Sequence, residues 1–380
     1  CLLKIMKKFL ILVLVLLFYS SFAWAETFTT QQTLSDDETF TVDSGDTYYY
    51  NGSNTIDAKD HSNVTVINNG NIIAHRTEAY PTEYRTCGSS CDDTIEAGGS
   101  VNFTLTNNGT IWAGHARTIN IKNATGNVTI TNNVGAKIAA GERQDDVEVL
   151  DLDGAGSSGD TITIVNHGTI ENTAKNFDLI GMSEIDNGAI VNFTNTGTIR
   201  QGTETNGSGN KYWGIVDAKD STDEINFNNS GTMQSSRRIF MLDGSTNFTI
   251  TNSGTIKQDN FAHHSQGDSA AKNAYAYATI QVGTYGSGTK IINLSSGTIS
   301  AFGQNNHAIT IGDNDANEAH SNATIENSGT ISAGSDDFGR AIIIIPSESG
   351  TITSGTTIKV KEEAEFTGGI DLGKTVSTIV

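Results

Sequence analysis

A short phrase of alternating apolar and polar positions recurs along most of the chain. Its clearest copy is FTITNSGTIKQ at residues 248–258, in which Phe248, Ile250 and Ile256 are apolar and most residues between them are polar. An alternation with a period of two residues is typical of a β-strand with one buried face. The phrase therefore predicts two short strands, one on each side of its Asn and Gly, that bury the same side of the chain.

The phrase recurs, but its spacing varies. Successive copies, numbered by their Gly, are separated by as few as 23 residues (Gly231 to Gly254) and as many as 43 (Gly254 to Gly297). A motif that recurs at unequal intervals is typical of stacked repeats whose loops differ in length. The glycines are Gly70, Gly109, Gly135, Gly168, Gly197, Gly231, Gly254, Gly297 and Gly329.

A further apolar run lies between successive copies. Examples are ARTINIK from Ala116, YATIQVG from Tyr277 and HAITIGD from His307. Three short strands in each repeat predict an all-β fold, a parallel β-helix or β-solenoid of about nine to eleven coils. No interval contains the apolar stripe of an amphipathic helix, which disfavours leucine-rich repeats. The shortest intervals have no room for the four strands of a propeller blade.

An Asn stands two residues before the Gly in eight of the nine copies, with Ser295 in the other. The strand parity places this Asn on the buried side, where stacked amides can hydrogen-bond to the copies above and below. The same residues also suit tight turns, and the two interpretations are compatible. In the third copy the position falls on Asn133, with Asn132 as an equal candidate. The predicted ladder comprises Asn68, Asn107, Asn166, Asn195, Asn229, Asn252 and Asn327.

The N-terminal residues have the features of an export signal. From Met6, two lysines are followed by an apolar run and then by Ala-Trp-Ala ending at Ala25, which is typical of a cleaved secretory signal peptide. We therefore expect residues 1–5 to be upstream translation, residues 6–25 the signal and residues 26–380 the mature β-helix. The run is short for a membrane span, so an uncleaved anchor is the weaker alternative, and we expect no stable membrane span in the mature chain.

Composition and charge limit the class of partner. The 380 residues include 40 Gly but only 2 Pro, and 23 Lys and Arg against 43 Asp and Glu give a net charge of −20. Such an acidic surface repels nucleic acid and anionic lipid headgroups, so we expect no nucleic-acid partner.

Two cysteines remain after the signal, Cys87 and Cys91, within TCGSSCDD. An even count in an exported chain predicts one disulfide. The alternative, half of a zinc site, needs two further ligands, and the nearest histidines, His75 and His115, lack a metal-ligand spacing.

The repeated N-x-G-T-I phrase, in an exported chain poor in Cys and Pro, resembles the passenger region of Gram-negative autotransporters from Phe40 to Val380. The resemblance implies a right-handed β-helix that is exported through the periplasm and then displayed at the outer-membrane surface or secreted. Its implied role is a non-enzymatic adhesin or surface stalk. Implied partners are a host-cell, neighbouring-cell or glycan surface, with the outer-membrane translocation machinery during export. The family adds a C-terminal β-barrel, which the last residues do not resemble, so we expect the passenger to be incomplete at its C-terminus.

The two longest intervals supply the candidate binding residues. They combine tyrosines and arginines, which provide contact area at interfaces, with a pair of histidines. Drifting, functionless insertions are the alternative interpretation. The candidates are Arg76, Tyr80, Tyr84, Arg85, His263, His264, Tyr275 and Tyr277.

The main functional alternative is a secreted polysaccharide-active β-helix enzyme, either a lyase or a hydrolase. Such an enzyme needs converging carboxylates with basic partners. The acidic pairs Asp92-Asp93, Asp145-Asp146 and Asp336-Asp337 fall beside turn residues without an evident basic cluster, so we interpret them as solvated loop carboxylates. Val42 to Asp46 lacks the full nucleophile phrase of a serine protease. We therefore predict no catalytic residues.

Two weaker signals remain. Asp151 to Ile164 and Gly312 to Glu318 partly resemble calcium-binding loops, so weak calcium binding is the one exception to an expected absence of cofactors. Paired threonines occur as Thr-x-Thr in three of the nine copies, at 104/106, 129/131 and 249/251. Such pairs can form ice-binding arrays on β-solenoids, but loops of varying length would interrupt an array, and β-propensity explains them adequately.

Overall fold

A computed structural model describes the chain from residue 25 to residue 380, with interruptions. The described ranges are 25–50, 52–74, 93–114, 116–141, 148–172, 178–201, 214–236, 238–258, 278–283, 288–302, 306–312, 323–334, 339–344, 355–372 and 378–380. The predicted signal peptide up to residue 24, both cysteines and all eight candidate binding residues lie outside these ranges.

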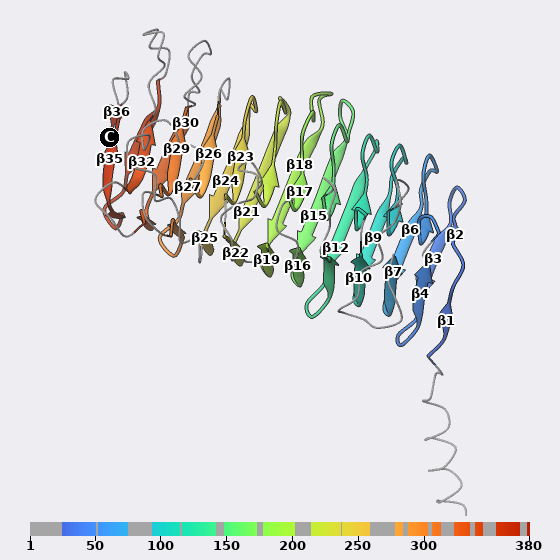
Figure 1. Ribbon diagram of the computed structural model, residues 1–380. Helices are drawn as coiled ribbons and strands as arrows, with labels where there is room; N and C mark the ends of the chain where they lie inside the picture. Colours follow the sequence, from blue (N-terminus) through green and yellow to red (C-terminus); the bar gives the residue numbers. More distant parts are fainter. Residues whose placement is uncertain are drawn as a thin grey trace, which may run out of the picture.

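The described chain forms an all-β, right-handed parallel β-helix, in which each coil contributes one strand to each of three sheets. Figure 1 shows these coils stacked along one axis, with the sequence running from one end of the rod to the other. Each sheet contains twelve parallel strands, which exceeds the nine to eleven coils expected. The difference arises because the first coil and the last two coils lack the repeated phrase: Val42 and Val360 occupy the place of its Asn in the first and eleventh coils, and the twelfth coil pairs in this sheet only through Thr378 and Ile379.

Strands are named along the chain, and every third strand belongs to the same sheet. Sheet A consists of β1 (Thr27–Phe28), β4 (Thr47–Tyr50), β7 (Asn71–Ala74), β10 (Thr110–Ala113), β13 (Lys137–Ala140), β16 (Thr169–Asn172), β19 (Thr198–Gln201), β22 (Thr232–Ser235), β25 (Thr255–Gln258), β28 (Thr298–Ser300), β31 (Thr330–Ser332) and β34 (Glu365–Thr367).

Sheet B contains the shortest strands. It consists of β2 (Gln32–Thr33), β5 (Ile56–Asp57), β8 (Ile95–Glu96), β11 (Ile119–Asn120), β14 (Leu150–Asp151), β17 (Ile180–Gly181), β20 (Val216–Asp217), β23 (Phe240–Leu242), β26 (Ile280–Val282), β29 (Ile309–Ile311), β32 (Arg340–Ile344) and β35 (Gly369–Asp371).

Sheet C contains the longest strands. It consists of β3 (Thr39–Val42), β6 (Thr65–Asn68), β9 (Thr104–Asn107), β12 (Val128–Asn132), β15 (Thr161–Asn166), β18 (Ile190–Asn195), β21 (Glu224–Asn229), β24 (Phe248–Asn252), β27 (Thr289–Asn293), β30 (Ala323–Asn327), β33 (Thr357–Val360) and β36 (Thr378–Ile379).

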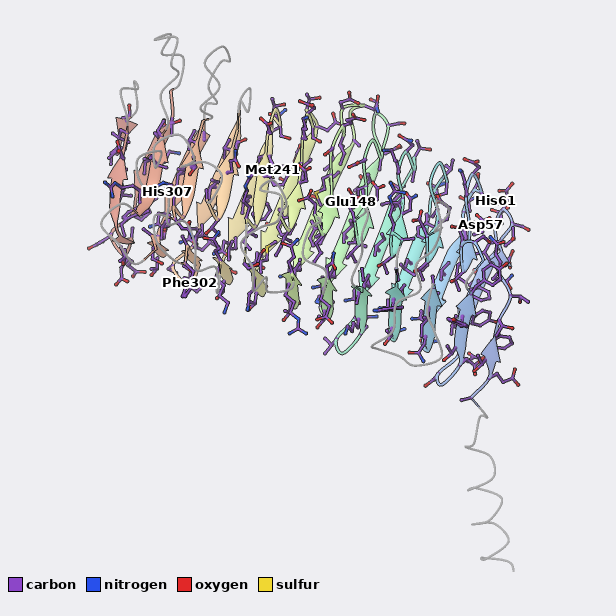
Figure 2. All side chains as sticks on the ribbon, viewed as in Figure 1. Asp57, His61, Glu148, Met241, Phe302 and His307 are labelled. Atoms are coloured by element: carbon purple, nitrogen blue, oxygen red, sulfur yellow. The ribbon has the colours of Figure 1, made fainter. Side chains whose placement is uncertain are left out.

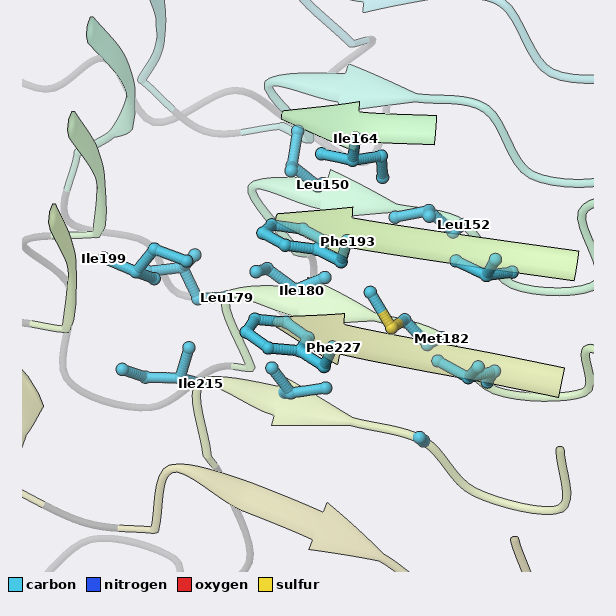
Figure 3. Close-up of a cluster of buried hydrophobic side chains, with 14 of the residues drawn as sticks. Leu150, Leu152, Ile164, Leu179, Ile180, Met182, Phe193, Ile199, Ile215 and Phe227 are labelled. Carbon is cyan, nitrogen blue, oxygen red and sulfur yellow. The ribbon is translucent and has the colours of Figure 1, made fainter. Parts of the chain in front are cut away.

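The core fills the space between the three sheets, as the alternation of apolar and polar residues predicts. In one coil Leu105 and Ile111 are fully buried while Thr104 and Thr106 are partly exposed. Figure 3 shows side chains from all three sheets meeting in the interior, among them Phe193 and Phe227. These two rings stack with centroids 4.5 Å apart. Burial of apolar side chains in successive coils supplies the main stabilisation of the rod.

The corner from sheet C to sheet A is formed by the Asn-x-Gly phrase. A Cβ added at Gly109 would overlap the carbonyl oxygen of Gly70 in the preceding coil. Glycine is therefore required here because the backbones of successive coils approach closely, a use that differs from left-handed turn geometry. The same overlap occurs between Gly197 and the oxygen of Gly168, and between Gly231 and the oxygen of Gly197.

The corner from sheet A to sheet B receives most of the long insertions. Residues 75–92 join β7 to β8, residues 202–213 join β19 to β20, and residues 259–277 join β25 to β26. All candidate binding residues of the sequence analysis belong to the first and third of these insertions, so they are attached to the rod along one corner.

Candidate functional site

A continuous ladder of asparagine side chains runs through sheet C. Asn68 donates from Nδ2 to Oδ1 of Asn107 at 2.7 Å, and each asparagine donates in the same way to the next one along the rod. The members are almost fully buried. The ladder comprises Asn68, Asn107, Asn132, Asn166, Asn195, Asn229, Asn252, Asn293 and Asn327.

The ladder also stabilises the turns that follow it. Oδ1 of Asn107 accepts a hydrogen bond from the backbone N–H of Gly109, and Nδ2 donates to the carbonyl oxygen of Lys137 in the next coil. The ladder and turn interpretations of these residues therefore both hold, because one amide has enough donors and acceptors for both.

The structure decides between the two candidates of the third copy and departs from the motif position in the eighth copy. The third copy uses Asn132 instead of Asn133, and the eighth uses Asn293, two residues before the Ser295 that the motif position indicates. In both coils four residues separate the ladder Asn from the next strand. In a coil with the usual spacing, only two residues separate Asn107 from Thr110. The longer turn shifts the Gly away from the Asn, while strand pairing keeps the Asn in register.

A second feature, absent from the sequence analysis, lies on the outer face of sheet B. The outward residue of each two-residue strand and the residue two positions before the first residue of each strand are often charged. Figure 2 shows Asp57, Glu148, Met241 and His307 following one another along this side of the rod. We name as the sheet B carboxylate row the residues Asp93, Glu96, Glu148, Asp151, Asp153, Asp178 and Asp217, which accompany Arg117 and Arg238.

Arg117 connects the carboxylates of the coils before and after it. Its Nε lies 2.6 Å from Oδ2 of Asp151 and 3.6 Å from Oε2 of Glu148, and its Nη1 lies 3.8 Å from Oδ2 of Asp93. Burial opposes the charge of Arg117, but the surrounding carboxylates, Asp151 foremost, raise its pKa. A partly buried cation surrounded by three carboxyl groups keeps its charge.

The neighbouring carboxyl groups are held by hydrogen bonds from the backbone and from one amide. Nδ2 of Asn120 donates to Oδ2 of Asp93 at 2.7 Å and to Oε2 of Glu96 at 3.0 Å. The backbone N–H of Gly98 donates to Oε1 of Glu96 at 2.8 Å. Asn120 therefore joins two carboxyl groups of the preceding coil into one network.

Several carboxyl groups of the row favour their neutral form. Burial, and then the charge of Asp151, raises the pKa of Glu148 to about 7. Burial, together with the hydrogen bond and charge of Asp93, raises the pKa of Glu96 to about 7. Crowded carboxyl groups in a poorly solvated place cannot all ionise together. Near neutral pH the row therefore contains both acid and carboxylate forms.

Farther along the rod, burial and then Asp153 raise the pKa of Asp217 to about 7, and burial raises the pKa of Asp178 well above its usual value. The backbone N–H of Gly214 donates to Oδ1 of Asp178. Arg238 is 2 % exposed, and its charge opposes both shifts. The pattern of one arginine among raised carboxyl groups therefore recurs.

These observations correct two interpretations made from sequence. Asp93 is buried and hydrogen-bonded instead of being a solvated loop carboxylate, and Arg117 supplies the basic partner that no neighbouring strand appeared to offer. A recurring four-residue phrase could have revealed the row: DTIE from Asp93, RTIN from Arg117 and EVLD from Glu148 each place polar or charged residues on both sides of a buried pair, which is Thr-Ile or Val-Leu. The other residues of the three acidic pairs lie outside the described ranges.

The first calcium-like stretch makes other contacts. Oδ1 of Asp153 accepts from the backbone N–H of Ser183 at 2.8 Å, and Oδ2 of Asp160 accepts from the N–H groups of Gly126 and Ser157. Within the described ranges, no group of three or more His, Cys, Asp or Glu side chains is arranged to hold a metal ion. Residues 313–318 of the second stretch are not among those described.

Comparisons of the chain with protein-family models, with curated proteins and with solved structures give no match. Among the described residues, no helix has the length and apolar character needed to cross a membrane. The features of the molecule that bear on its function are therefore the rod, its insertions and the sheet B carboxylate row.

Proposed function

We propose that this chain is the passenger region of a Gram-negative autotransporter and acts as a non-enzymatic adhesin or surface stalk. The parallel β-helix and the N-x-G-T-I repeat support the resemblance, and residues 6–25 have the pattern of an export signal. The proposed partners are a host-cell, neighbouring-cell or glycan surface.

One observation carries the proposal. The two insertions that hold the candidate tyrosines, arginines and histidines are both attached between a sheet A strand and the next sheet B strand. Insertions leave a stack of coils without interrupting its strand pairing, so a rigid rod can present them along one corner. Such an arrangement suits a stalk that carries contact segments.

The display function is tested by replacing residues 260–274 with Asn-Gly and, separately, by deleting residues 76–91. Both variants should keep the β-rich circular dichroism spectrum and cooperative melting of the parent but attach less to cells or to a glycan array. Glu148→Gln serves as the control and should attach normally. Full attachment by both shortened variants would show that the insertions do not bind.

Export is tested separately on intact cells that produce the full chain. Added protease should cleave the displayed chain, and removal of residues 6–25 should leave it protected inside the cell. Protection of the chain with its signal intact would contradict surface display.

A secreted polysaccharide-active enzyme is the second candidate, and the sheet B carboxylate row favours it. Glu148, with its raised pKa, and Asp151, ion-paired with Arg117, resemble the acid and carboxylate that glycoside cleavage requires. It ranks second because the Asp151 side chain is only 1 % exposed, whereas a catalytic group must touch its substrate. Release of reducing ends or unsaturated products from a polysaccharide panel, abolished by Glu148→Gln, would reverse this order.

A further inference from the structure

The outer face of sheet C carries two columns of residues in register. The first begins with Thr39, which pairs with Thr65, and the second begins with Thr41, which pairs with Ile67. The first column is Thr39, Thr65, Thr104, Thr129, Thr163, Asn192, Asn226 and Thr249, and the second is Thr41, Ile67, Thr106, Thr131, Val165, Thr194, Asn228 and Thr251. We call these positions, on strands β3 to β24, the sheet C array.

The sheet C array has an unusual composition for this chain. It contains no charged and no aromatic residue, although the chain carries 43 Asp and Glu. Every position is Thr, Ile, Val or Asn. Within the two columns themselves charge appears only beyond β24, where Lys290, Glu326 and Lys359 occupy outward positions. Charged Glu224 begins β21 at the margin of the array and does not belong to either column.

The threonine hydroxyls of the sheet C array are available to solvent. The threonines are partly or fully exposed, and in the part of the chain that the structure describes none of their side chains forms a hydrogen bond. Exposed hydroxyls without a protein partner hydrogen-bond to water instead. Their neighbours in each column are spaced by one strand separation, about 4.8 Å.

The insertions leave the array uninterrupted. Up to β25, all residues of the turns that enter and leave sheet C belong to the described ranges. The insertions in this part of the chain, and residue 51, all lie in connections from sheet A to sheet B. Residues 284–287, 313–322 and 345–354 join sheet B to sheet C, but only beyond β26. Variation in loop length therefore does not break the register of the threonine columns, contrary to the expectation from sequence.

We propose that the sheet C array binds the surface of ice. Hydroxyl and methyl groups repeated at a fixed spacing can hold first-shell water in a regular layer, and ice is a ligand whose surface has a regular repeat of water molecules. Partners with other chemistry fit less well. A protein interface is enriched in aromatic residues and Arg, and nucleic acid requires Lys and Arg, none of which occurs in the array.

This inference concerns a strand face and goes beyond the proposed display function, because it holds whether or not the insertions bind cells. Its test uses the purified chain in ice-affinity partitioning and in an ice-recrystallisation assay. The chain should enter growing ice and slow recrystallisation, whereas serum albumin should be excluded. Exclusion of the parent chain would overturn the proposal whatever its variants do.

Two variants locate the binding face. Thr129→Lys and Thr104→Lys each place a charged chain in the middle of the array and should lose partitioning into ice. Thr232→Lys is the matched control, because Thr232 is an outward, partly exposed threonine of sheet A and should retain it. Melting followed by circular dichroism verifies that each variant is folded.

Three outcomes would contradict the assignment. Partitioning by a folded Thr129→Lys or Thr104→Lys at the parent level would remove ice binding from this face, as would equal loss in Thr232→Lys. Binding to crystalline cellulose or chitin without entry into ice would show that an ordered polysaccharide is the ligand instead.

Discussion

Nε of Arg117 lies 2.6 Å from Oδ2 of Asp151, and this contact joins residues that stand 34 positions apart in the chain and one coil apart in the rod. The side chain of Arg117 is 30 % exposed and that of Asp151 only 1 %. Removing one partner of such an ion pair destabilises the fold, because the remaining charge stays buried without a counter-charge.

Arg117→Gln should therefore destabilise the rod strongly. The change leaves Asp93, Glu148 and Asp151 without their shared cation, and breaking a buried pair costs roughly 3 kcal/mol. Urea unfolding followed by circular dichroism measures the change. Lys122→Gln is the control: Nζ of Lys122 lies 4.0 Å from Asp153 and its side chain is 43 % exposed, so its loss should cost no more than about 1 kcal/mol. Equal costs for both variants would contradict the buried network.

The raised pKa values predict how stability depends on pH. Glu96, Glu148 and Asp217 have pKa values of about 7 in the folded chain, above those of an unfolded chain, so the folded state binds more protons between about pH 4 and pH 7. Stability contributed by these groups is present at low pH and is lost as the pH rises through the folded values. The midpoint of urea unfolding should therefore be higher at pH 5 than at pH 8.

The pKa of Glu171 is shifted in the opposite direction, so its effect on stability falls in a different pH range. Burial opposes its ionisation, but Lys137 and Arg200 hold its pKa below the usual value. Its contribution is lost only as the pH falls below about 4.5, so it does not affect the comparison between pH 5 and pH 8. Glu148→Gln should reduce the difference between these two pH values. A difference that is unchanged in this variant would show that Glu148 is not among the titrating groups.

Interruption of the asparagine ladder should destabilise the coils around it. Asn195→Leu removes the acceptor of Asn166 and the donor to Asn229, whose side chains are both buried. Loss of buried hydrogen-bond partners costs roughly 1 to 3 kcal/mol, and amide hydrogen exchange should rise in the neighbouring coils. Asn108→Leu is the control, since Asn108 is exposed and water can replace its hydrogen bonds to Asn69 and Asn133. Melting and exchange unchanged from the parent in Asn195→Leu would mean that the ladder adds no stability.

Substitution of a repeat glycine should cost more stability where its backbone lies against the backbone of the preceding coil. At Gly231 any side chain overlaps the carbonyl oxygen of Gly197, so Gly231→Asn should cost 1 to 3 kcal/mol or more, by roughly the cost of overpacking. Gly135→Asn is the matched control. Its φ is 81° and no atom lies near an added Cβ, and Asn tolerates left-handed backbone. Thermal melting distinguishes the two, and similar melting temperatures would contradict the close approach of the backbones.

The sequence alone determined the β-helix and most of the ladder. A period of two residues specifies which side of each strand is buried, and a phrase that repeats with this period specifies the same side in every coil. The side chains of Phe248, Ile250 and Asn252 are fully buried for this reason. The choice of buried side is determined locally, because each strand has its own pattern of apolar and polar residues.

Register between coils was decided by the tertiary structure. Asn132 and Asn133 are equivalent by composition, and Asn293 stands four residues before its Gly instead of two, so only strand pairing selects the residues that stack. The sheet C array became visible for the same reason. Counting Thr-x-Thr pairs found three isolated copies, whereas pairing aligns Ile67, Val165 and Asn192 into the same columns.

The sheet B carboxylate row also could not be predicted from the sequence. Its strands β8, β11 and β14 contain only two residues each, too few to show a period, and Asp93, Arg117 and Asp151 are separated by insertions of unequal length. Charged residues in such segments resemble solvated loops in sequence. Only the stacking of coils brings them within a few ångströms of one another and away from water, and the raised pKa of Glu148 follows from that burial.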